Sequence, residues 1–339
     1  MHKIKKRVLF MGWKAAQSRV RTRKFNKLAF LVIGIVVAII VLGYLVRFIK
    51  FFWGQGISWD GKTNIYLVAK TSSTSIFTYK PREKEIIIVN IPDETYIDTA
   101  LGYGRWKVGS LFGLGGQELV DRSLSSLLGL PIDGNVRFEG NYQNKNPQQI
   151  IDTLRSSPFG FTSLMRDIKT NLSPPELWRI YLSLLRVRFD KISYFDLKDL
   201  KLLDKVILAD GTAALVADPI KIDGFIESKF ADATIKEEAS SVAVFNGTNH
   251  PGLAQKAARI IINSGGNVII QSNLSLQVKK SFVFSLPKQK TFTEKRLASI
   301  FVSPSCQHDP ECATLNEYLT SSRAQINVIL GEDFYEKVK

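Results

Sequence analysis

The sequence is poor in the residues that most often build metal and redox sites. Its 339 residues include only two cysteines and three histidines. Cys306, Cys312 and His308 do not complete the usual tetrahedral ligand set of a structural zinc ion. P-loop, Gly-x-Ser-x-Gly and His-Glu-x-x-His patterns are also missing. We therefore expect no metal, and we assign no catalytic, cofactor-binding or metal-binding residue from these patterns.

Acidic residues are missing from residues 1–27, which carry ten Lys or Arg. Residues 28–46 follow, and these 19 residues contain no charge at all. A helix needs roughly 20 apolar residues to cross the ~30 Å hydrocarbon layer, so 28–46 predicts one transmembrane helix. Because Lys and Arg are retained on the cytoplasmic side, we expect a basic cytoplasmic tail and an extracytoplasmic remainder in the cell membrane.

A cleaved signal peptide is the alternative, but its apolar core runs about 7–15 residues and ends at small residues. Here the core is longer, and residues 47–53 read Arg-Phe-Ile-Lys-Phe-Phe-Trp. The basic tail also suits nucleic-acid phosphates, yet no helix-turn-helix or zinc pattern accompanies it. Attraction to anionic lipid headgroups is the simpler account, at about 1 kcal/mol per basic residue near the surface. We expect the lipid bilayer as a partner and no nucleic acid.

The portion after the anchor is nearly balanced in charge, because the tail supplies most of the formal net charge of +15. Its length is sufficient for two domains with proper cores. Both cysteines lie in this portion, with the five residues of a polar turn between them. In an oxidising compartment a Cys306–Cys312 disulfide is the expected pairing.

Residues 60–225 alternate strand-like and helix-like patterns, which predicts an α/β domain. Short β-branched runs at 64–68, 75–79 and 85–91 are typical of strands, and Ile86 to Val89 is expected to be buried on both faces. A Gly-rich loop at 101–116 precedes apolar residues at helical spacing over 118–128. Ser173 followed by Pro174, Pro175 and Glu176 predicts the start of a further helix.

Residues 226–240 form a charged linker, and residues 241–335 form a small domain. Strands are expected at 241–245, 267–271, 281–286 and 325–330, with helices at 252–263 and 293–301. This β-α-β-β-α-β order predicts a split β-α-β sandwich. Asn246 and Gly247 should form a tight turn in the left-handed region. With Gly252 at the following helix start they are either a binding edge or a purely structural turn.

Two parts of the chain resemble bacterial envelope families. The motifs Val-Phe-Asn-Gly-Thr at 244–248, Gly-Leu-Ala at 252–254 and Leu-Gly-Glu-Asp at 330–333 resemble the LytR C-terminal domain. The preceding domain resembles a divergent LytR-CpsA-Psr (LCP) domain, through its strand at 64–68 and its Ile-Pro-Asp-Glu-Thr segment at 91–95. LCP members transfer undecaprenyl-pyrophosphate-linked glycopolymers to peptidoglycan, using Asp for magnesium and several Arg for the pyrophosphate.

The residues that carry this activity in the family are mostly missing here. Ala69-Lys70 stands where the family has its first-strand Asp, and Asp93 replaces the Arg after Ile-Pro. The family's Arg-x-Arg segment is not found between residues 140 and 161. Arg105 and Lys107 are either remnants of an anion pocket or ordinary surface cations. Since pyrophosphate binding needs several cations in fixed geometry, we lean against an enzyme.

The sequence thus predicts a membrane-anchored α/β envelope protein of LytR type that is non-catalytic. It would bind or organise cell-wall polymer (peptidoglycan or wall glycopolymer) or a partner envelope protein. One alternative is an active LCP phosphotransferase, which would require Mg²⁺. Another is a transcriptional attenuator or regulator that acts through the basic tail.

Overall fold

The computed structural model describes residues 34–35, 37–46, 59–156, 160–208, 211–285, 291–301, 315 and 322–339. They belong to two separate units, Met1–Ile57 and Ser58–Lys339. In the first unit, 34–35 and 37–46 are helical, with exposed side chains. None of the described helices combines the length and the apolarity needed to cross a membrane. Residues 28–33 and 36 of the predicted anchor, the tail 1–27 and both cysteines lie outside the described residues.

A six-stranded sheet forms the centre of the second unit, in the order β7-β6-β1-β2-β3-β8. Its strands are β1 (Ile65–Lys70), β2 (Thr74–Lys80), β3 (Glu85–Ile91), β6 (Gly134–Phe138), β7 (Ile168–Thr170) and β8 (Ile192–Asp196). β1 pairs with β6 and β3 with β8 in parallel, whereas β2 is antiparallel to both of its neighbours. The carboxyl ends of β1, β3, β6 and β8 therefore lie at the same edge.

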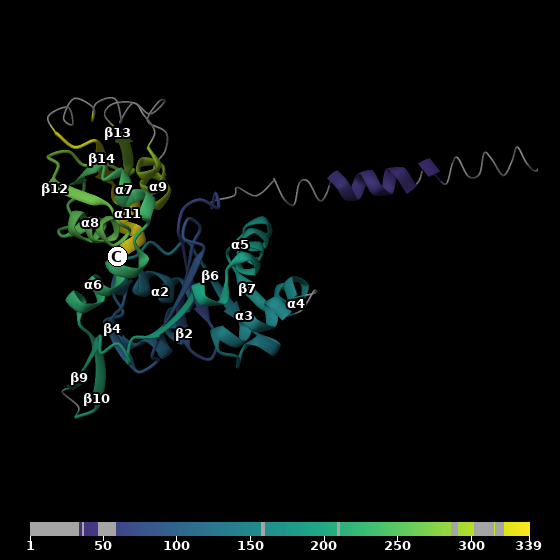
Figure 1. The fold of residues 1–339 in the computed structure, drawn as a ribbon. Coiled ribbons are helices and arrows are strands. Elements are labelled where there is room, and N and C mark those ends of the chain that lie inside the picture. Colours follow the sequence, from purple (N-terminus) through teal and green to yellow (C-terminus); the bar gives the residue numbers. More distant parts are fainter. Residues whose placement is uncertain are drawn as a thin grey trace, which may run out of the picture. The chain divides into compact units, whose positions relative to one another are not determined.

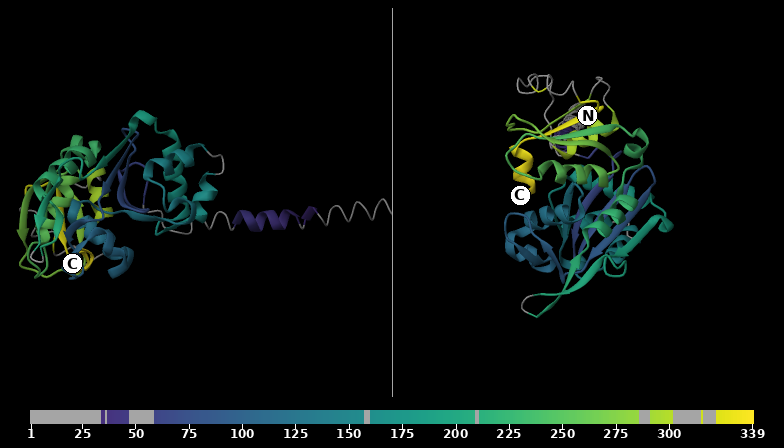
Figure 2. Two further views of the ribbon diagram at one scale, coloured as in Figure 1. Left: turned by 90° about the horizontal axis from the view of Figure 1, so that it is seen from below. Right: turned by 90° about the vertical axis from the view of Figure 1, so that its left-hand side faces the viewer.

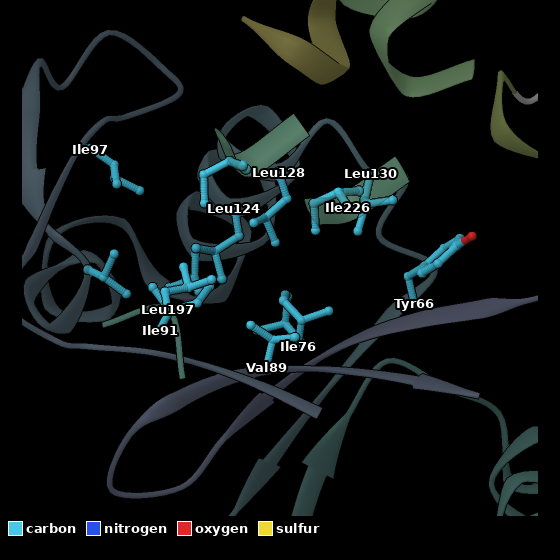
Figure 3. Packing of buried hydrophobic residues seen from close by; sticks show 14 of the residues in the cluster. Tyr66, Ile76, Val89, Ile91, Ile97, Leu124, Leu128, Leu130, Leu197 and Ile226 are labelled. Atoms are coloured by element: carbon cyan, nitrogen blue, oxygen red, sulfur yellow. The ribbon is translucent and has the colours of Figure 1, made fainter. Parts of the chain in front are cut away.

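Helices cover both faces of this sheet, which makes the domain a three-layer α/β structure. α2 (Leu111–Leu128) and α6 (Pro219–Phe230) pack on one face, where Figure 3 shows Leu124, Leu128 and Ile226 over Ile76 and Val89. α3 (Pro147–Ser156), α4 (Gly160–Arg166) and α5 (Pro174–Arg186) cover the other face. Successive side chains of a strand point to opposite faces of the sheet, so the strands contribute to the hydrophobic core on each face. The predicted burial of Ile86 to Val89 on both faces is confirmed.

A second, four-stranded sheet has the order β5-β4-β10-β9. It contains β4 (Thr95–Asp98), β5 (Arg105–Lys107), β9 (Leu203–Ile207) and β10 (Ala213–Ala217). β9 and β10 extend away from the helices as an antiparallel pair (Figure 1). Short 3₁₀ turns lie at Val108–Ser110, Gly140–Tyr142 and Phe189–Lys191.

The helix starts follow local chemistry. Glu176 accepts hydrogen bonds from the N–H and the hydroxyl of Ser173, at 2.8 and 2.6 Å, so the predicted start of α5 is confirmed. The Gly-rich loop expected up to residue 116 is instead partly helical. α2 begins at Leu111 and breaks at Gly115 and Gly116, where Gly116 has φ of 70°. That left-handed backbone favours glycine, so the break occurs inside the helix rather than before it.

The segment expected to be a charged linker is folded into helices. α6 ends at Phe230, and α7 (Ala233–Glu238) follows with Asp232 as its N-cap. Ile226, Phe230 and Ile235 are buried, and only the remaining positions carry the charges that suggested a linker.

The elements from β11 onward form a module of their own, coloured green to yellow in Figure 2. They are β11 (Ser241–Asn246), α8 (Leu253–Asn263), β12 (Asn267–Asn273), β13 (Phe282–Ser285), α9 (Phe292–Ile300), β14 (Ile326–Leu330) and α11 (Glu332–Val338). The β-α-β-β-α-β order is as predicted, but the split arrangement is wrong. β11 pairs directly with β12 and with β14, both in parallel, in the sheet order β12-β11-β14-β13. Apolar periodicity identifies strands and does not specify their neighbours.

Polar contacts join this module to the α/β domain. The Arg259 guanidinium pairs with Asp223 and donates to the carbonyls of Ser126 and Leu127. Arg296 of α9 makes two hydrogen bonds of 2.9 Å to the carboxylate of Asp133. The module and the domain thus share one compact unit.

Candidate functional site

An apolar cavity of about 90 Å³ lies between the six-stranded sheet and α3, α4 and α5. Because side chains alternate along β1, Leu67 and Ala69 face this cavity while Tyr66 and Val68 face α2 and α6. The other walls come from β2, β3, β6 and the three helices. The lining side chains from those elements include Phe77, Ile88, Val136, Phe138, Ile150, Ile151, Leu154, Leu164, Leu177, Ile180, Tyr181 and Leu184.

The chemistry of this cavity is that of a hydrocarbon site. None of the described residues that line it is charged, and its only side-chain hydroxyls are those of Thr71 and Tyr181. Such a site favours apolar chains, at about 0.8 kcal/mol for each buried CH₂ group. The described residues of its lining include no carboxylate, imidazole, amine, guanidinium or thiol.

Lys70 and Asp93, two of the positions that depart from the LCP pattern, lie next to each other. Lys70 is the last residue of β1, and its Nζ lies 3.5 Å from Oδ1 of Asp93 and 3.1 Å from Oγ1 of Thr74. The family resemblance implies an acid near position 70 and an arginine at position 93. This chain instead has a cation at position 70 and an anion at position 93. The charges at the two positions are therefore exchanged relative to the family, at the edge of the sheet where the carboxyl ends of the parallel strands lie. Sequence reasoning noted each departure but not that the two residues pair.

The neighbouring cations at this edge are also neutralised. Arg137 is the register partner of Lys70 on β6, and it hydrogen-bonds Glu139 at 2.6 Å while its guanidinium stacks on Phe112. Lys169 lies 3.0 Å from the same carboxylate. Hydrogen bonds from Lys169, and then from Arg137, lower the pKa of Glu139, so this acid stays ionised. Lys70, Arg137 and Lys169 therefore each have an acidic partner.

Arg105 and Lys107 lie on β5, at the edge of the second sheet, and they do not line the apolar cavity. Arg105 pairs with Asp98 at 2.7 Å, and a hydrogen bond to that carboxylate raises the pKa of the guanidinium. The ammonium of Lys107 lies 5.8 Å from the centre of the Tyr96 ring. Both side chains are exposed, and their role as an anion site stays a prediction.

The Asn246 turn is held together by its own side chain. Asn246 is buried, its Oδ1 accepts from the N–H and hydroxyl of Thr248, and its Nδ2 donates to the carbonyl of His250. Gly247 does not have the expected left-handed backbone. A Cβ there would lie 2.8 Å from Cγ2 of Val278, so close packing is the reason for glycine. The left-handed residue is Gly252, the N-cap of α8, with φ of 79°.

Other candidate ligands in this module serve local structure. The His250 ring stacks on Tyr335 with centroids 3.3 Å apart, and its Nε2 lies 3.1 Å from Glu332. Within the described part of the chain, no three His, Cys, Asp or Glu residues gather as a metal site. The predicted Cys306–Cys312 disulfide lies outside that part.

Comparisons with known proteins find a partial likeness to solved structures. The crystal structure of Bacillus subtilis TagT matches with a TM-score of 0.37 and 13% identity, over 49% of this chain and 89% of TagT. A structure of TagT, described as a LytR-CPS2A-psr family protein, with bound octaprenyl pyrophosphate lipid is also similar. It matches with a TM-score of 0.34 and 13% identity, over 49% of this chain and 89% of that chain. The Lin1025 protein of Listeria innocua matches with a TM-score of 0.36 and 12% identity, over 49% of this chain and 96% of that chain. The structural neighbours thus include LCP proteins, as the sequence resemblance implied, at low identity and over half of the chain.

Neither protein-family models nor curated proteins show a match to this sequence.

Proposed function

We propose that this protein is a cell-envelope protein of LCP type that holds the apolar chain of a lipid-linked wall-polymer precursor and does not transfer its phosphoryl group. The observation that carries the proposal is the uncharged cavity between the sheet and α3, α4 and α5. One TagT structure contains bound octaprenyl pyrophosphate lipid. We extend this class of ligand, a polyprenyl lipid, to the present protein.

The cavity suits part of such a lipid. At about 90 Å³ it is smaller than the ~150 Å³ apolar cavity that accommodates benzene, so it accepts a short stretch of hydrocarbon. Burying one five-carbon isoprene unit would contribute about 4 kcal/mol at 0.8 kcal/mol per carbon. The rest of the chain would stay outside the cavity, where a membrane or a partner protein covers it.

The electrostatics of the sheet edge favour a non-catalytic role. Pyrophosphate transfer requires cations free to hold two phosphates together with a metal ion held by acids. Here Lys70 is paired with Asp93, and Glu139 holds both Arg137 and Lys169. Binding a pyrophosphate would first require breaking these pairs.

We further propose that the chain is a single-pass membrane protein with its N-terminus in the cytoplasm and its globular domains outside. The change in charge from residues 1–27 to 28–46 supports this topology. Large apolar side chains on the helix of 37–46 are exposed, including Ile39 at 62% and Leu42 at 61%. We expect a C-terminal alkaline phosphatase fusion to be active and a cytoplasmic reporter fused there to be silent. The reverse pattern would refute this topology.

Lipid binding is tested on the full chain in nanodiscs, with decaprenyl phosphate as the probe and native mass spectrometry as the readout. Ala69→Phe fills the cavity from β1 and should weaken binding at least tenfold. Ala213→Phe, the matched substitution at an exposed position of β10, should bind as the unchanged protein does. If Ala69→Phe lowers the melting temperature sharply, Ile180→Trp on α5 replaces it. Equal binding by the cavity variants and the control would disprove the lipid site.

The non-catalytic part of the proposal has its own assay. The full chain, supplied with lipid-pyrophosphate-linked polymer, peptidoglycan and Mg²⁺, should give no transfer above the protein-free rate. Transfer that disappears in Arg105→Ala together with Lys107→Ala would instead establish an active phosphotransferase with a rearranged site.

A further inference from the structure

A second and larger cavity, of about 340 Å³, lies between the α/β domain and the C-terminal module. Its walls come from α2 on one side and from α8, α9 and α11 on the other. Ile260, Phe334 and Trp59 supply apolar surface, and Arg122, Arg296 and Lys337 supply positive charge. The volume is within the range of small-molecule sites, roughly 300–1,000 Å³.

The acids in this cavity are already engaged by the protein. Asp133 is held by Arg296, and Asp121 accepts hydrogen bonds from Gln117 at 2.7 Å and Asn135 at 2.6 Å. Glu176 accepts from the backbone N–H of Trp59 and from Ser173. Burial also raises the pKa of Asp121, which favours the neutral form of this carboxyl relative to a solvent-exposed aspartate.

The cations are less completely engaged. Arg122 pairs with Glu118 and donates to the carbonyl of Glu336. Lys337, on α11, has no ion pair among the described residues. Burial by the surrounding walls lowers the pKa of Lys337, and the positive charge of Arg122 lowers it further, against the opposing effect of Asp333. Lys337 therefore lies in the field of a second cation, Arg122, and of one acid, Asp333.

An adjoining pocket of about 60 Å³ shares Arg122 and Lys337 and adds Lys256 and Arg259 from α8. Arg259 is committed to Asp223. Among the described residues, the Nζ of Lys256 makes a single contact of this kind, 3.4 Å from the carbonyl of Val338. Cations from α2, α8 and α11 thus converge where the two cavities meet. Convergent positive charge at the opening of a partly apolar cavity is what a small anion requires.

We propose that this interdomain cleft binds a small phosphate-bearing molecule, with the phosphate between Arg122, Lys256 and Lys337 and its ring against Ile260 and Phe334. Because the ligand contacts both the domain and the module, its binding stabilises their contact. A wall precursor sugar phosphate has this chemistry, and so does free phosphate, which uses only the cationic part. This site is separate from the lipid cavity, so its existence does not depend on the proposed function.

The test is calorimetric titration of the full chain in detergent with glucose 1-phosphate, inorganic phosphate and glucose. We expect glucose 1-phosphate to bind most tightly, inorganic phosphate at least tenfold more weakly, and glucose not at all. Lys256→Met together with Lys337→Met should weaken glucose 1-phosphate binding at least tenfold. Lys198→Met is the matched control, because Lys198 is exposed and lies outside both pockets, and it should leave the affinity unchanged.

Three results would overturn the proposal. The first is glucose binding as tightly as glucose 1-phosphate, which would mean that the site does not recognise the phosphate group. The second is equal affinity for inorganic phosphate and glucose 1-phosphate, which would mean that the site binds the phosphate ion and makes no favourable contact with the sugar ring. The third is undiminished binding by the double variant while its melting temperature matches that of the unchanged protein. Retained binding by Ala69→Phe, the lipid-cavity variant, would show that the two sites act separately.

Discussion

Asp133→Ala should lower the free energy of unfolding by about 3–5 kcal/mol, because it leaves the guanidinium of Arg296 buried without its anion. Arg296 is only 4% exposed, and both of its hydrogen bonds to Asp133 are 2.9 Å long. The same carboxylate accepts the backbone N–H of Tyr66, so the substitution also removes a partner of β1. Urea denaturation of the full chain in detergent, followed by circular dichroism, measures the loss.

Two companion variants separate this effect from loss of the side chain alone. Asp98→Ala breaks the exposed pair with Arg105 and should cost far less than Asp133→Ala, because water and salt screen a pair at the surface. Adding Arg296→Met to Asp133→Ala removes the unpaired charge and should recover more than half of the loss. A double variant as unstable as Asp133→Ala would contradict the account, since the buried charge would then not be the cause.

The strands of the α/β domain were predictable because their signal is local. β-branched runs bounded by turns predicted β1, β2 and β3 within a residue or two, and Ser173 with Glu176 predicted the start of α5. The same patterns predicted the order of elements in the C-terminal module. They did not predict that β11 lies directly beside β12, because strand adjacency depends on contacts between distant residues.

The candidate site was predictable only in part, for the same reason. The loss of family residues at positions 70 and 93 was visible in the sequence. Their pairing across the ends of β1 and β3 was not, since it requires the fold. The apolar cavity and the interdomain cleft likewise arise from residues on several elements. Arg105 and Lys107 stood out in sequence through the family resemblance, yet they lie on exposed β5 and line neither cavity.

The segment 226–240 shows how composition misleads. Its charges suggested a solvated linker, but Phe230 at the end of α6 is fully buried. Its ring lies 6.3 Å from that of Tyr66 and 6.2 Å from that of Phe225. Its carbonyl accepts hydrogen bonds from the Tyr66 hydroxyl and the Asn64 amide. Phe230 thus anchors the connection to β1, and the buried Asp232 adds to it, because its carboxylate accepts the backbone N–H of Asn64.

Phe230→Ala should therefore destabilise the protein by about 3–5 kcal/mol, the usual loss for a buried aromatic ring whose cavity is not refilled. Ile220→Ala on the same helix is the control. Ile220 is 84% exposed, so its truncation should change stability by no more than about 0.5 kcal/mol. Both values follow from the urea midpoints of the full chain when the slope of the unfolding free energy against urea concentration is unchanged. A loss below about 1 kcal/mol for Phe230→Ala would mean that the segment 226–240 is a linker after all, because a solvated connector has no ring to bury.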